Sequence, residues 1–511
     1  MAVDTAAAPA AFTLTADEHA DLVAVCHAGV ERARTTGRHA LVSWARPYEL
    51  ADPLVAWARA RTRTGRSLYW QSAWDGTTVL AFGSAHDLRG TGADRLATIR
   101  SAWTALVQET VTGGMSGAGQ GPLAVGGFAF ADPAGAAPGA LPEALLWVPL
   151  LQLRHTAPES AEPTGLAGLA GLDLAEPTGP ATAELRLNAL VDGSDDPELL
   201  ARTLTLRVGR CLAARDTGAL DTGIRHADDP RSALRAVSSV ETPAAGEWKG
   251  LVRSATERMR AGDFEKVVLA RRLDVTADRE FDVPAAVRRL RETYTGTAVF
   301  AFGHGGTTFL GATPEYLVRV GNREVEALGL AGTTPRGAGP EEDLAFEAEL
   351  SGSTKLRHEH EVVVRMLSDV LAESCVDVTA GTEPQVLKLA NVQHLSTPVR
   401  ARLPEGSAEG VLGLAARLHP TPALGGHPRA EALDWLARHE GFDRGWYAGA
   451  VGFTDGTGNG QFAVAIRSAL VQGRSAALYA GCGLVADSDP DTEYAETCAK
   501  LRPMRAALGL D

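Results

Sequence analysis

The sequence predicts a mixed α/β fold in which mainly antiparallel strands form sheets that helices cover. Aromatic and β-branched residues over 67–83 flank an Asp75-Gly76 pair, which is typical of a hairpin. Residues 297–320 contain two or three strand-like runs around a Gly-Gly turn. Residues 446–485 are predicted to form an antiparallel meander. The stretches between these regions show the apolar spacing of helices.

In the N-terminal half, helices and strands are predicted to alternate. Residues 1–12 form an Ala-rich tail that we expect to be flexible. Helices are predicted over 14–34 and around 93–110, and the paired glycines of 121–130 indicate a strand with close backbone packing. Residues 158–228 are rich in Ala, Gly, Leu, Thr and Pro and show weaker periodicity, so no element is predicted there.

The C-terminal half has clearer patterns. A helix is predicted from about 244 to 261, and the branched residues of KVVLARRLDV (266–275) indicate a strand. The stretch 358–373 keeps its apolar residues on one face, which predicts a helix. A last helix is expected to begin near Asp489-Pro490, because proline is favoured at the first helical position.

Composition and charge narrow the class of function. Of the 511 residues, 45% are hydrophobic and 22% are charged, which is ordinary for a globular chain with a large core. The formal net charge is −14, so the chain offers no broad basic surface for nucleic acid or anionic lipid, and we expect neither as a partner. A small anionic substrate is still allowed, because local cations set the field inside a pocket.

The cysteines and the N-terminus favour a cytoplasmic protein. The five cysteines lie far apart and form no CxxC pair, so we interpret them as reduced core residues. The N-terminal residues carry no basic segment, and no stretch of about 18 uninterrupted apolar residues occurs. A monomer is compatible with the sequence, which leaves the oligomeric state open.

Two groups of acidic residues could meet at a divalent cation. Glu493, Glu496 and Lys500 share one helix face at spacings of three and four residues. Such a set alone is usually a solvated surface ion pair. The HEHE segment adds Glu359 and Glu361 on another predicted helix, and Mg²⁺ prefers hard oxygen ligands from one or two carboxylates. Glutamates on two helices could therefore face each other across one ion.

Lys266 and Glu315 are candidate acid–base groups. Lys266 begins an apolar strand, where an outward-facing, exposed lysine is the ordinary interpretation. Were it to point inward, burial would favour the neutral amine that a general base requires. Glu315 follows a proline at the end of a strand-like run, and a partly dry site would hold it protonated, ready to act as an acid.

Arg467 and several glycines could contact a bound anion. Arg467 lies in FAVAIRSAL, a predicted central strand where an unpaired guanidinium is costly, so an anionic partner is expected. Gly481, Gly483 and the segment AGTTPRG (331–337) would bring backbone N–H groups close to bound oxygens. Tight packing is the alternative explanation for such glycines.

Nine short segments resemble, in this order, the chorismate-utilising enzyme family: FEKVVLARR, FLGATPEYLV, LAGTTPRG, KLRHEHEVVV, HPTPALGG, WYAGAVGF, VAIRSA, AGCGLV and DPDTEYAETCAKL. That family includes isochorismate, salicylate, anthranilate and aminodeoxychorismate synthases. Its members share an α/β fold of two stacked, mainly antiparallel sheets bordered by helices. The strong motifs cover 245–511 and weaker similarity extends through most of the N-terminal half. The resemblance therefore implies one chorismate-binding catalytic domain over 13–511, like anthranilate synthase component I.

The resemblance implies roles for individual residues. Lys266 would activate a water molecule as a base, and Glu315 would protonate the departing 4-hydroxyl of chorismate. Glu359 and Glu496 would bind Mg²⁺, which holds the ring carboxylate of the substrate. Glu493 would support the ion directly or through a water molecule.

The resemblance also implies a substrate-binding wall around the ring, its carboxylates and the enolpyruvyl side chain. The implied wall residues are Gly332, Thr333, His419, Ala423, Leu424, Tyr447, Arg467, Gly481, Gly483 and Lys500. One departure concerns Leu356, three residues before Glu359, where many family members carry Asp or Glu. One outer carboxylate is therefore missing, and we expect a lower affinity for Mg²⁺.

Within the family, two features favour an isochorismate synthase. Lys266 resembles the water-using members. Ala423 and Leu424 resemble isochorismate synthases, whereas salicylate-forming and amine-forming relatives more often carry threonine at the alanine position. A salicylate synthase is the second interpretation, and a binding protein that has lost turnover is the third. The sequence does not indicate whether the product serves menaquinone, a siderophore or salicylate.

Overall fold

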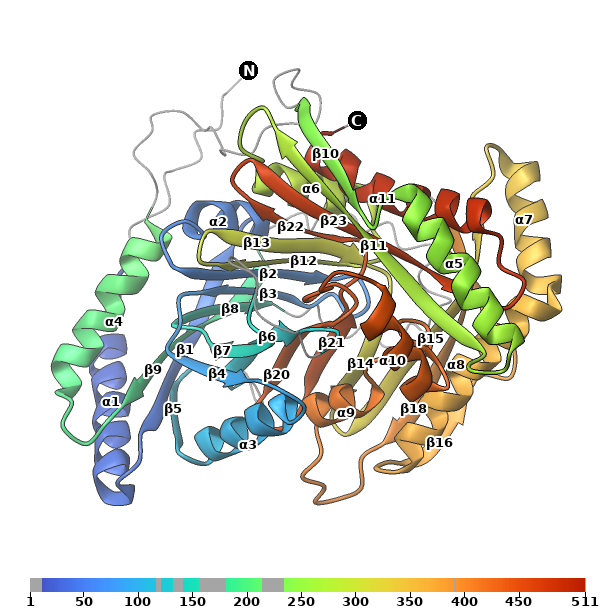
Figure 1. Ribbon diagram of the computed structural model, residues 1–511. Coiled ribbons are helices and arrows are strands. Elements are labelled where there is room, and N and C mark those ends of the chain that lie inside the picture. The colour runs from blue at the N-terminus through green and yellow to red at the C-terminus, as the bar shows by residue number, and fades with distance from the viewer. Residues whose placement is uncertain are drawn as a thin grey trace.

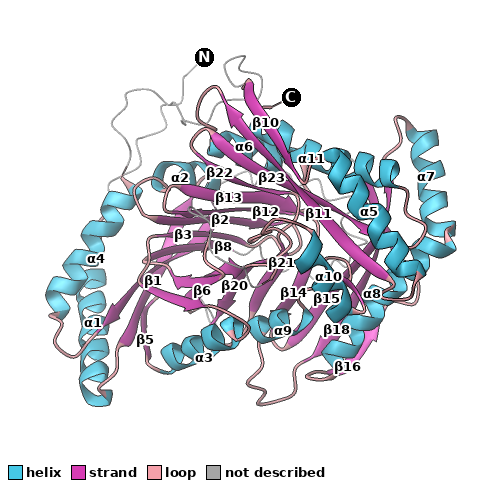
Figure 2. Cartoon of the chain, in the orientation of Figure 1, coloured by secondary structure: helices cyan, strands magenta, loops and turns pink. Residues whose placement is uncertain are grey.

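The computed structural model describes residues 12–115, 121–131, 141–155, 181–213, 234–389 and 392–510. Within these residues the chain builds two large β-sheets with helices around them (Figure 1). Figure 2 shows the strands in the middle of the molecule and the helices mostly at its periphery. Residues 1–11 of the predicted tail and residues 156–180 lie outside the described part.

The larger sheet contains thirteen strands among the described residues. Along the sheet the order is β10 (Ala236–Thr242), β11 (Lys266–Ala277), β23 (Ser475–Leu484), β22 (Ser468–Gln472), β13 (Thr307–Thr313), β12 (Ala298–His304), β2 (Arg66–Ser72), β3 (Thr78–Phe82), β8 (Leu151–His155), β9 (Ala181–Val191), β1 (Ala40–Leu50) and β5 (Thr110–Gly114), and β19 (Gly426–His427) also pairs with β11. The β1–β5 ladder is parallel and the others are antiparallel. Strands from both halves of the chain form one continuous sheet, since β2 of the N-terminal half pairs with β12 of the C-terminal half.

The smaller sheet contains ten described strands, all antiparallel. Their order is β16 (Val376–Ala380), β18 (Val392–Arg402), β15 (Glu324–Pro335), β14 (Tyr316–Gly321), β21 (Gly460–Val464), β20 (Ala450–Asp455), β6 (Leu123–Phe128), β7 (Ala144–Val148) and β4 (His86–Gly90), with β17 (Gln385–Lys388) on β18. The predicted close packing of paired glycines is confirmed in β6. A Cβ on Gly126 would lie 1.9 Å from the Leu145 carbonyl oxygen.

Eleven helices lie among the described residues. They are α1 (Ala16–Thr36), α2 (Pro53–Ala60), α3 (Arg95–Gln108), α4 (Pro197–Leu212), α5 (Ala245–Arg260), α6 (Val283–Thr293), α7 (Pro340–Gly352), α8 (Thr354–Ala372), α9 (Val411–Leu418), α10 (Arg429–His439) and α11 (Pro490–Leu508). The predicted helices over 14–34, 93–110, 244–261 and 358–373 are confirmed, as is the strand over 266–275. No described helix combines the length and apolarity needed to cross a membrane.

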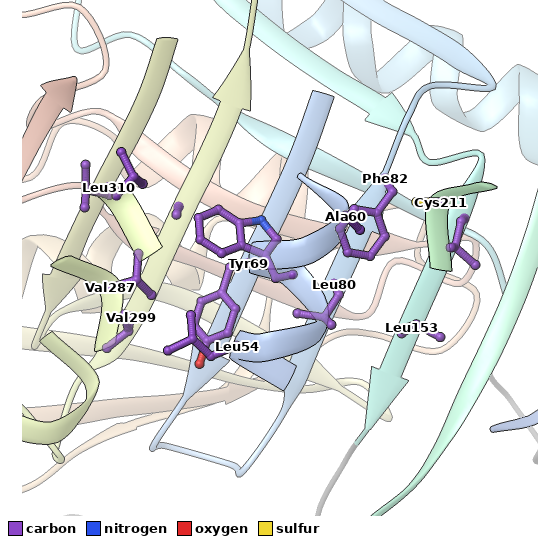
Figure 3. Packing of buried hydrophobic residues seen from close by; sticks show 14 of the residues in the cluster. Leu54, Ala60, Tyr69, Leu80, Phe82, Leu153, Cys211, Val287, Val299 and Leu310 are labelled. Atoms are coloured by element: carbon purple, nitrogen blue, oxygen red, sulfur yellow. The ribbon is translucent and has the colours of Figure 1, made fainter. Parts of the chain in front are cut away.

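The two sheets enclose an apolar layer. Trp70 of the larger sheet packs edge-on against Phe453 of the smaller sheet, with ring centroids 6.0 Å apart. On the other face of the larger sheet, residues of β2 and β3 pack against α2. Figure 3 shows Leu54 of α2 beside Tyr69 of β2 in this second cluster. Because side chains alternate along a strand, neighbours such as Tyr69 and Trp70 belong to different cores.

The two hairpins predicted within 446–485 are confirmed, but their strands do not form one continuous meander. The two hairpins belong to different sheets: β20 and β21 lie in the smaller sheet, β22 and β23 in the larger one. The chain crosses between the sheets just before Ser468, at Arg467, whose φ is 50°. The sequence context of Arg467 predicted a central strand. The structure places Arg467 in a connection between two strands instead. A left-handed residue of this kind redirects the chain, which breaks the strand pattern.

A second crossing lies beside the first. The chain passes from β13 in the larger sheet to β14 in the smaller sheet through Pro314 and Glu315. Backbone hydrogen bonds join the two crossings, because Val464 N donates to Glu315 O at 3.0 Å and Ala312 N donates to Arg467 O at 3.2 Å. The fold thus brings two residues distant in sequence to one place between the sheets.

Candidate active site

One cavity gathers nearly all of the predicted site residues. It has a volume of about 420 Å³ and is lined by β11, β15, β23, α8, α11, the two crossings and the loop before β19. The predicted residues that line it are Lys266, Glu315, Gly332, Thr333, Glu359, Ala423, Leu424, Tyr447, Arg467, Gly481, Gly483, Glu493, Glu496 and Lys500. A volume of this size suits a small ligand.

Lys266 points inward from the first position of β11. Its side chain is only 7% exposed, and its Nζ lies 2.5 Å from Oε1 of Glu359 on α8. Gly483 of β23 faces this pair. A Cβ on Gly483 would come within 3.0 Å of Lys266 Cε and 3.3 Å of Glu359 Oε1. The glycine therefore leaves the room in which the lysine and the carboxylate meet.

Glu315 is a buried carboxyl group in the first crossing. Its side chain makes no hydrogen bond through Oε1 within the described residues. Burial raises the pKa of Glu315 to about 8, although the positive charges of Lys266 and Arg467 act in the opposite direction. At neutral pH the group is therefore mostly protonated, as a general acid must be.

Arg467 offers a positive charge to the cavity. No carboxylate of the described residues lies within ion-pair distance of its guanidinium. Next to it, the rings of Tyr447 and Tyr479 stack with centroids 5.1 Å apart. Burial raises the pKa of Tyr447 to about 12, so its hydroxyl stays neutral. The hydroxyl can donate a hydrogen bond from beside Gly481, where a Cβ would lie 3.2 Å from it.

Three carboxylates come from two helices. Glu359 on α8 pairs with Lys266, and Glu496 on α11 pairs with Lys500 at 2.5 Å. Lys500 Nζ also donates to Gly481 O at 3.0 Å. Glu493 accepts a hydrogen bond from Ser488 Oγ at 2.7 Å. Burial and the neighbouring Glu496 raise the pKa of Glu493.

The donor set fits a hard divalent cation that the protein only partly surrounds. Among the described residues, no group of three or more His, Cys, Asp or Glu side chains is arranged to hold a metal ion by itself. Carboxylate oxygens on two helices line one cavity nevertheless. Mg²⁺ commonly takes one or two carboxylates and completes its shell with water and substrate oxygens, which this arrangement allows.

The Gly332–Thr333 segment forms another part of the wall. Gly332 has a φ of 74°, which interrupts the β15 register and favours glycine. Its neighbour across the wall is Leu356 of α8, whose Cβ would lie 3.4 Å from a Cβ on Gly332. His394 Nδ1 lies 3.0 Å from Thr333 Oγ1. Burial, with the charges of Arg467 and Lys500, lowers the pKa of His394 to about 3, so the ring is neutral.

Comparison with known proteins identifies the family. A sequence profile described as "Chorismate binding enzyme" matches residues 28–162 and 181–509. The chain belongs to the chorismate-binding enzyme family. A Pseudomonas aeruginosa protein named salicylate biosynthesis isochorismate synthase is 35% identical over 492 residues, which cover 94% of each chain. Isochorismate synthase MenF of Bacillus subtilis is 31% identical over 495 residues, or 95% of this chain and 97% of that protein.

A solved structure supports the fold. Anthranilate synthase component I from Streptococcus pneumoniae superposes with a TM-score of 0.63 at 20% identity, covering 84% of this chain and 92% of that chain. The predicted fold of two large, mainly antiparallel sheets bordered by helices is confirmed. The resemblance drawn from the nine sequence motifs is confirmed as well.

His419 is the one predicted binding residue of this family member that does not line the cavity. Its buried ring lies against Phe128 and Phe130, and its Nε2 lies 3.2 Å from the Phe130 carbonyl oxygen. The structure therefore places it at the C-terminal end of α9, buried among aromatic side chains and outside the cavity lining. Burial lowers the pKa of His419 to about 3, which suits a neutral packing role.

Several lining residues escaped the sequence analysis. They include His394, Arg444, Tyr479, Glu349 and Lys355. A lone histidine or tyrosine in an apolar strand is usually a core residue, and Arg444 lies in a charged loop that resembles a solvated turn. The sequence signal for Lys355 and Glu349 was their nearness to the HEHE segment on the α7–α8 pair.

Proposed function

We propose that the chain is an isochorismate synthase that converts chorismate to isochorismate with the help of Mg²⁺. The observation that carries the proposal is the shared cavity of Lys266 and Glu315, an amine and a carboxyl group that is protonated at neutral pH. The two full-length relatives described above, both named as isochorismate synthases, support it.

In the proposed mechanism two residues move protons. Lys266, which acts as a base in its neutral amine form, takes a proton from a water molecule as the water oxygen attacks C2 of the ring. The ring double bond shifts and the C4–O bond breaks. Glu315 gives its proton to the departing hydroxyl, which leaves as water, so that the substrate is isomerised with no net change in composition. Proton transfer between the two residues through solvent restores the starting state.

Other residues would bind and orient the substrate. Arg467 has no ion-pair partner among the described residues and can offer its guanidinium to a substrate carboxylate, which a guanidinium can hold through two parallel hydrogen bonds. The neutral Tyr447 hydroxyl and the Gly332–Thr333 backbone line the same cavity. The cavity therefore offers hydrogen-bond donors to the carboxylates of the substrate, and its glutamates would interact with the substrate only through a bound cation.

Mg²⁺ would be held by Glu359 and Glu496, with Glu493 as a nearby supporting group. When bound, the ion would neutralise the ring carboxylate of the substrate, which the glutamates would otherwise repel. Lys266 and Lys500 pair with these two carboxylates, so the site has cations next to both of its candidate metal ligands. The side chain of Leu356, which also lines the cavity, carries no oxygen that could support the ion.

A salicylate synthase is the alternative. Such an enzyme forms isochorismate and then breaks the C3–O bond, moving the C2 hydrogen to the methylene carbon and releasing salicylate and pyruvate. The small Ala423 beside Leu424 favours the simpler reaction, because the resemblance links this pair to isochorismate synthases. The printed name of the Pseudomonas aeruginosa relative connects its isochorismate synthase activity to salicylate biosynthesis.

Product analysis tests the proposal. Purified protein is mixed with chorismate and Mg²⁺, and the products are separated chromatographically beside authentic standards. Isochorismate without pyruvate is the expected result. Salicylate with an equal amount of pyruvate would favour the alternative, and unchanged chorismate that nevertheless binds would leave only the binding protein.

A further inference from the structure

Strand β11, which carries Lys266, has an incomplete neighbour on one edge. Strand β23 pairs with it from Val267 to Thr276 on one side. On the other side, β19 pairs with Lys266 and Val267, and β10 pairs only from Arg272 onward. The backbone between these two partners has no strand beside it within the described residues. Buried backbone groups of this kind need other hydrogen-bond partners.

Two side chains take the place of the missing strand. Glu440 Oε1 accepts the hydrogen bond of Ala270 N at 2.7 Å, and Arg444 Nη2 donates to Val268 O at 2.6 Å. The two side chains also bind each other, because Arg444 Nε donates to Glu440 Oε2 at 2.7 Å. The side chains of this ion pair are only 2% and 6% exposed. The buried pair therefore satisfies the backbone hydrogen bonds of β11 where no strand pairs with it.

The same arginine holds the loop that borders the substrate cavity. Arg444 Nη1 donates to Leu424 O at 3.1 Å, and its guanidinium lies 4.1 Å from the centroid of the Phe130 ring. Val268 N donates to Gly425 O at 2.9 Å, which joins the loop to β11 a second time. Arg444 itself lines the cavity together with Leu424 and Val268.

We infer that the Glu440–Arg444 pair positions other groups for the reaction. This inference rests on the proposed function. The pair locks the loop that carries Ala423 and Leu424 to the strand that carries Lys266. The ring of the substrate would be confined by the loop while water is activated by the lysine, so their relative placement sets the angle of attack. A rigid bidentate guanidinium suits this task, because it fixes several acceptors in one plane. Small displacements of reacting groups are costly for the rate.

The inference predicts a specific kinetic effect. Arg444→Met should lower kcat by about tenfold to a hundredfold, because the attack geometry is relaxed. The KM for chorismate should change by less than about threefold, because the groups that bind its carboxylates remain. Arg444→Lys, which keeps the charge and one donor, should recover part of the lost kcat. Glu440→Gln keeps the shape of the partner and serves as a second variant should Arg444→Met fail to fold.

The matched control is another buried ion pair outside the cavity. Arg186 Nε lies 2.9 Å from Glu184 Oε1, and the side chains are 1% and 9% exposed. Arg186→Lys should lower Tm as Arg444→Lys does but leave kcat unchanged. Normal kcat in both Arg444→Lys and Glu440→Gln, or an equal fall in kcat in Arg186→Lys, would overturn the inference. Absence of isochorismate with the unmodified protein would instead overturn the proposed function, so the two failures are distinguishable.

Discussion

Lys266 Nζ and Glu359 Oε1 lie 2.5 Å apart across the cavity, which places the proposed base in direct contact with a proposed metal ligand. The contact joins β11 to α8 through two residues that are 93 positions apart in the sequence. Gly483 makes the contact sterically allowed. The chemistry of the base and the binding of the cation are thus expected to depend on each other.

Replacement of Lys266 by alanine should abolish hydration. The rate should fall by roughly 10²–10⁴-fold, the usual contribution of a positioned acid–base group. Chorismate binding should remain largely intact, because Arg467 and Tyr447 are unchanged. Steady-state rates and equilibrium binding of chorismate check this. Lys355→Ala, which removes an exposed lysine from the same cavity, is the control, and near-normal turnover of Lys266→Ala would discard the base assignment.

The activity should decline on the alkaline side as Glu315 loses its proton. Because the pKa of Glu315 is raised to about 8, the acid form dominates below that pH and is lost as the pH rises through it. Glu315→Gln, which cannot donate a proton, should be roughly 10²–10⁴-fold slower at every pH. Measured kcat against pH checks both statements. An alkaline limb that persists unchanged in a residually active Glu315→Gln protein would refute the assignment.

Stability should respond to pH through the same residue. The pKa of Glu315 is higher in the folded protein, at about 8, than in the unfolded chain. As the pH rises from the unfolded-state pKa towards about 8, the unfolded chain loses this proton while the folded protein keeps it, so the free energy of unfolding falls. Glu315→Gln has no such penalty. The Tm of the variant should therefore exceed that of the unmodified protein by a margin that grows between about pH 5 and pH 8. A constant difference across this range would contradict the buried, protonated state.

The proposed metal ligands can be tested with a matched pair of Glu→Gln variants on α8. Glu359→Gln removes a proposed ligand, whereas Glu361→Gln changes an exposed carboxylate on α8 that does not line the cavity. Mg²⁺ titration by calorimetry, together with activity, should show loss in the first variant and normal behaviour in the second. Glu496→Gln should resemble Glu359→Gln. Unchanged Mg²⁺ dependence in either cavity variant would show that the ligand assignment is wrong.

Leu356 offers a gain-of-function test. It lines the cavity three residues before Glu359, where the family resemblance led us to expect an acidic residue. Leu356→Asp should lower the Mg²⁺ concentration for half-maximal activity by roughly tenfold, the size of effect that outer-shell groups commonly have. Leu356→Asn is the neutral control of the same shape. Equal Mg²⁺ affinity in the two variants would show that a carboxylate at position 356 does not contribute to Mg²⁺ binding.

The elements of the fold could be predicted where local pattern decides them. The strand that begins at Lys266 and the helix of Glu359 follow from alternation and from one apolar face. Which sheet a hairpin joins is a long-range property, so the crossing at Arg467 looked like strand interior. Buried polar support is equally hidden, because Glu440 and Arg444 have the composition of a surface turn until the missing strand beside Ala270 is known.

The most direct measurement follows the oxygen atom that Lys266 is proposed to activate. Chorismate is incubated with the protein and Mg²⁺ in water labelled with ¹⁸O, and the isochorismate is analysed by mass spectrometry at early times. The proposed mechanism predicts one heavy oxygen in the new C2 hydroxyl and none in either carboxylate. Isochorismate that retains only the original oxygen would show that the hydroxyl migrates within the substrate, and would contradict the account of an activated water.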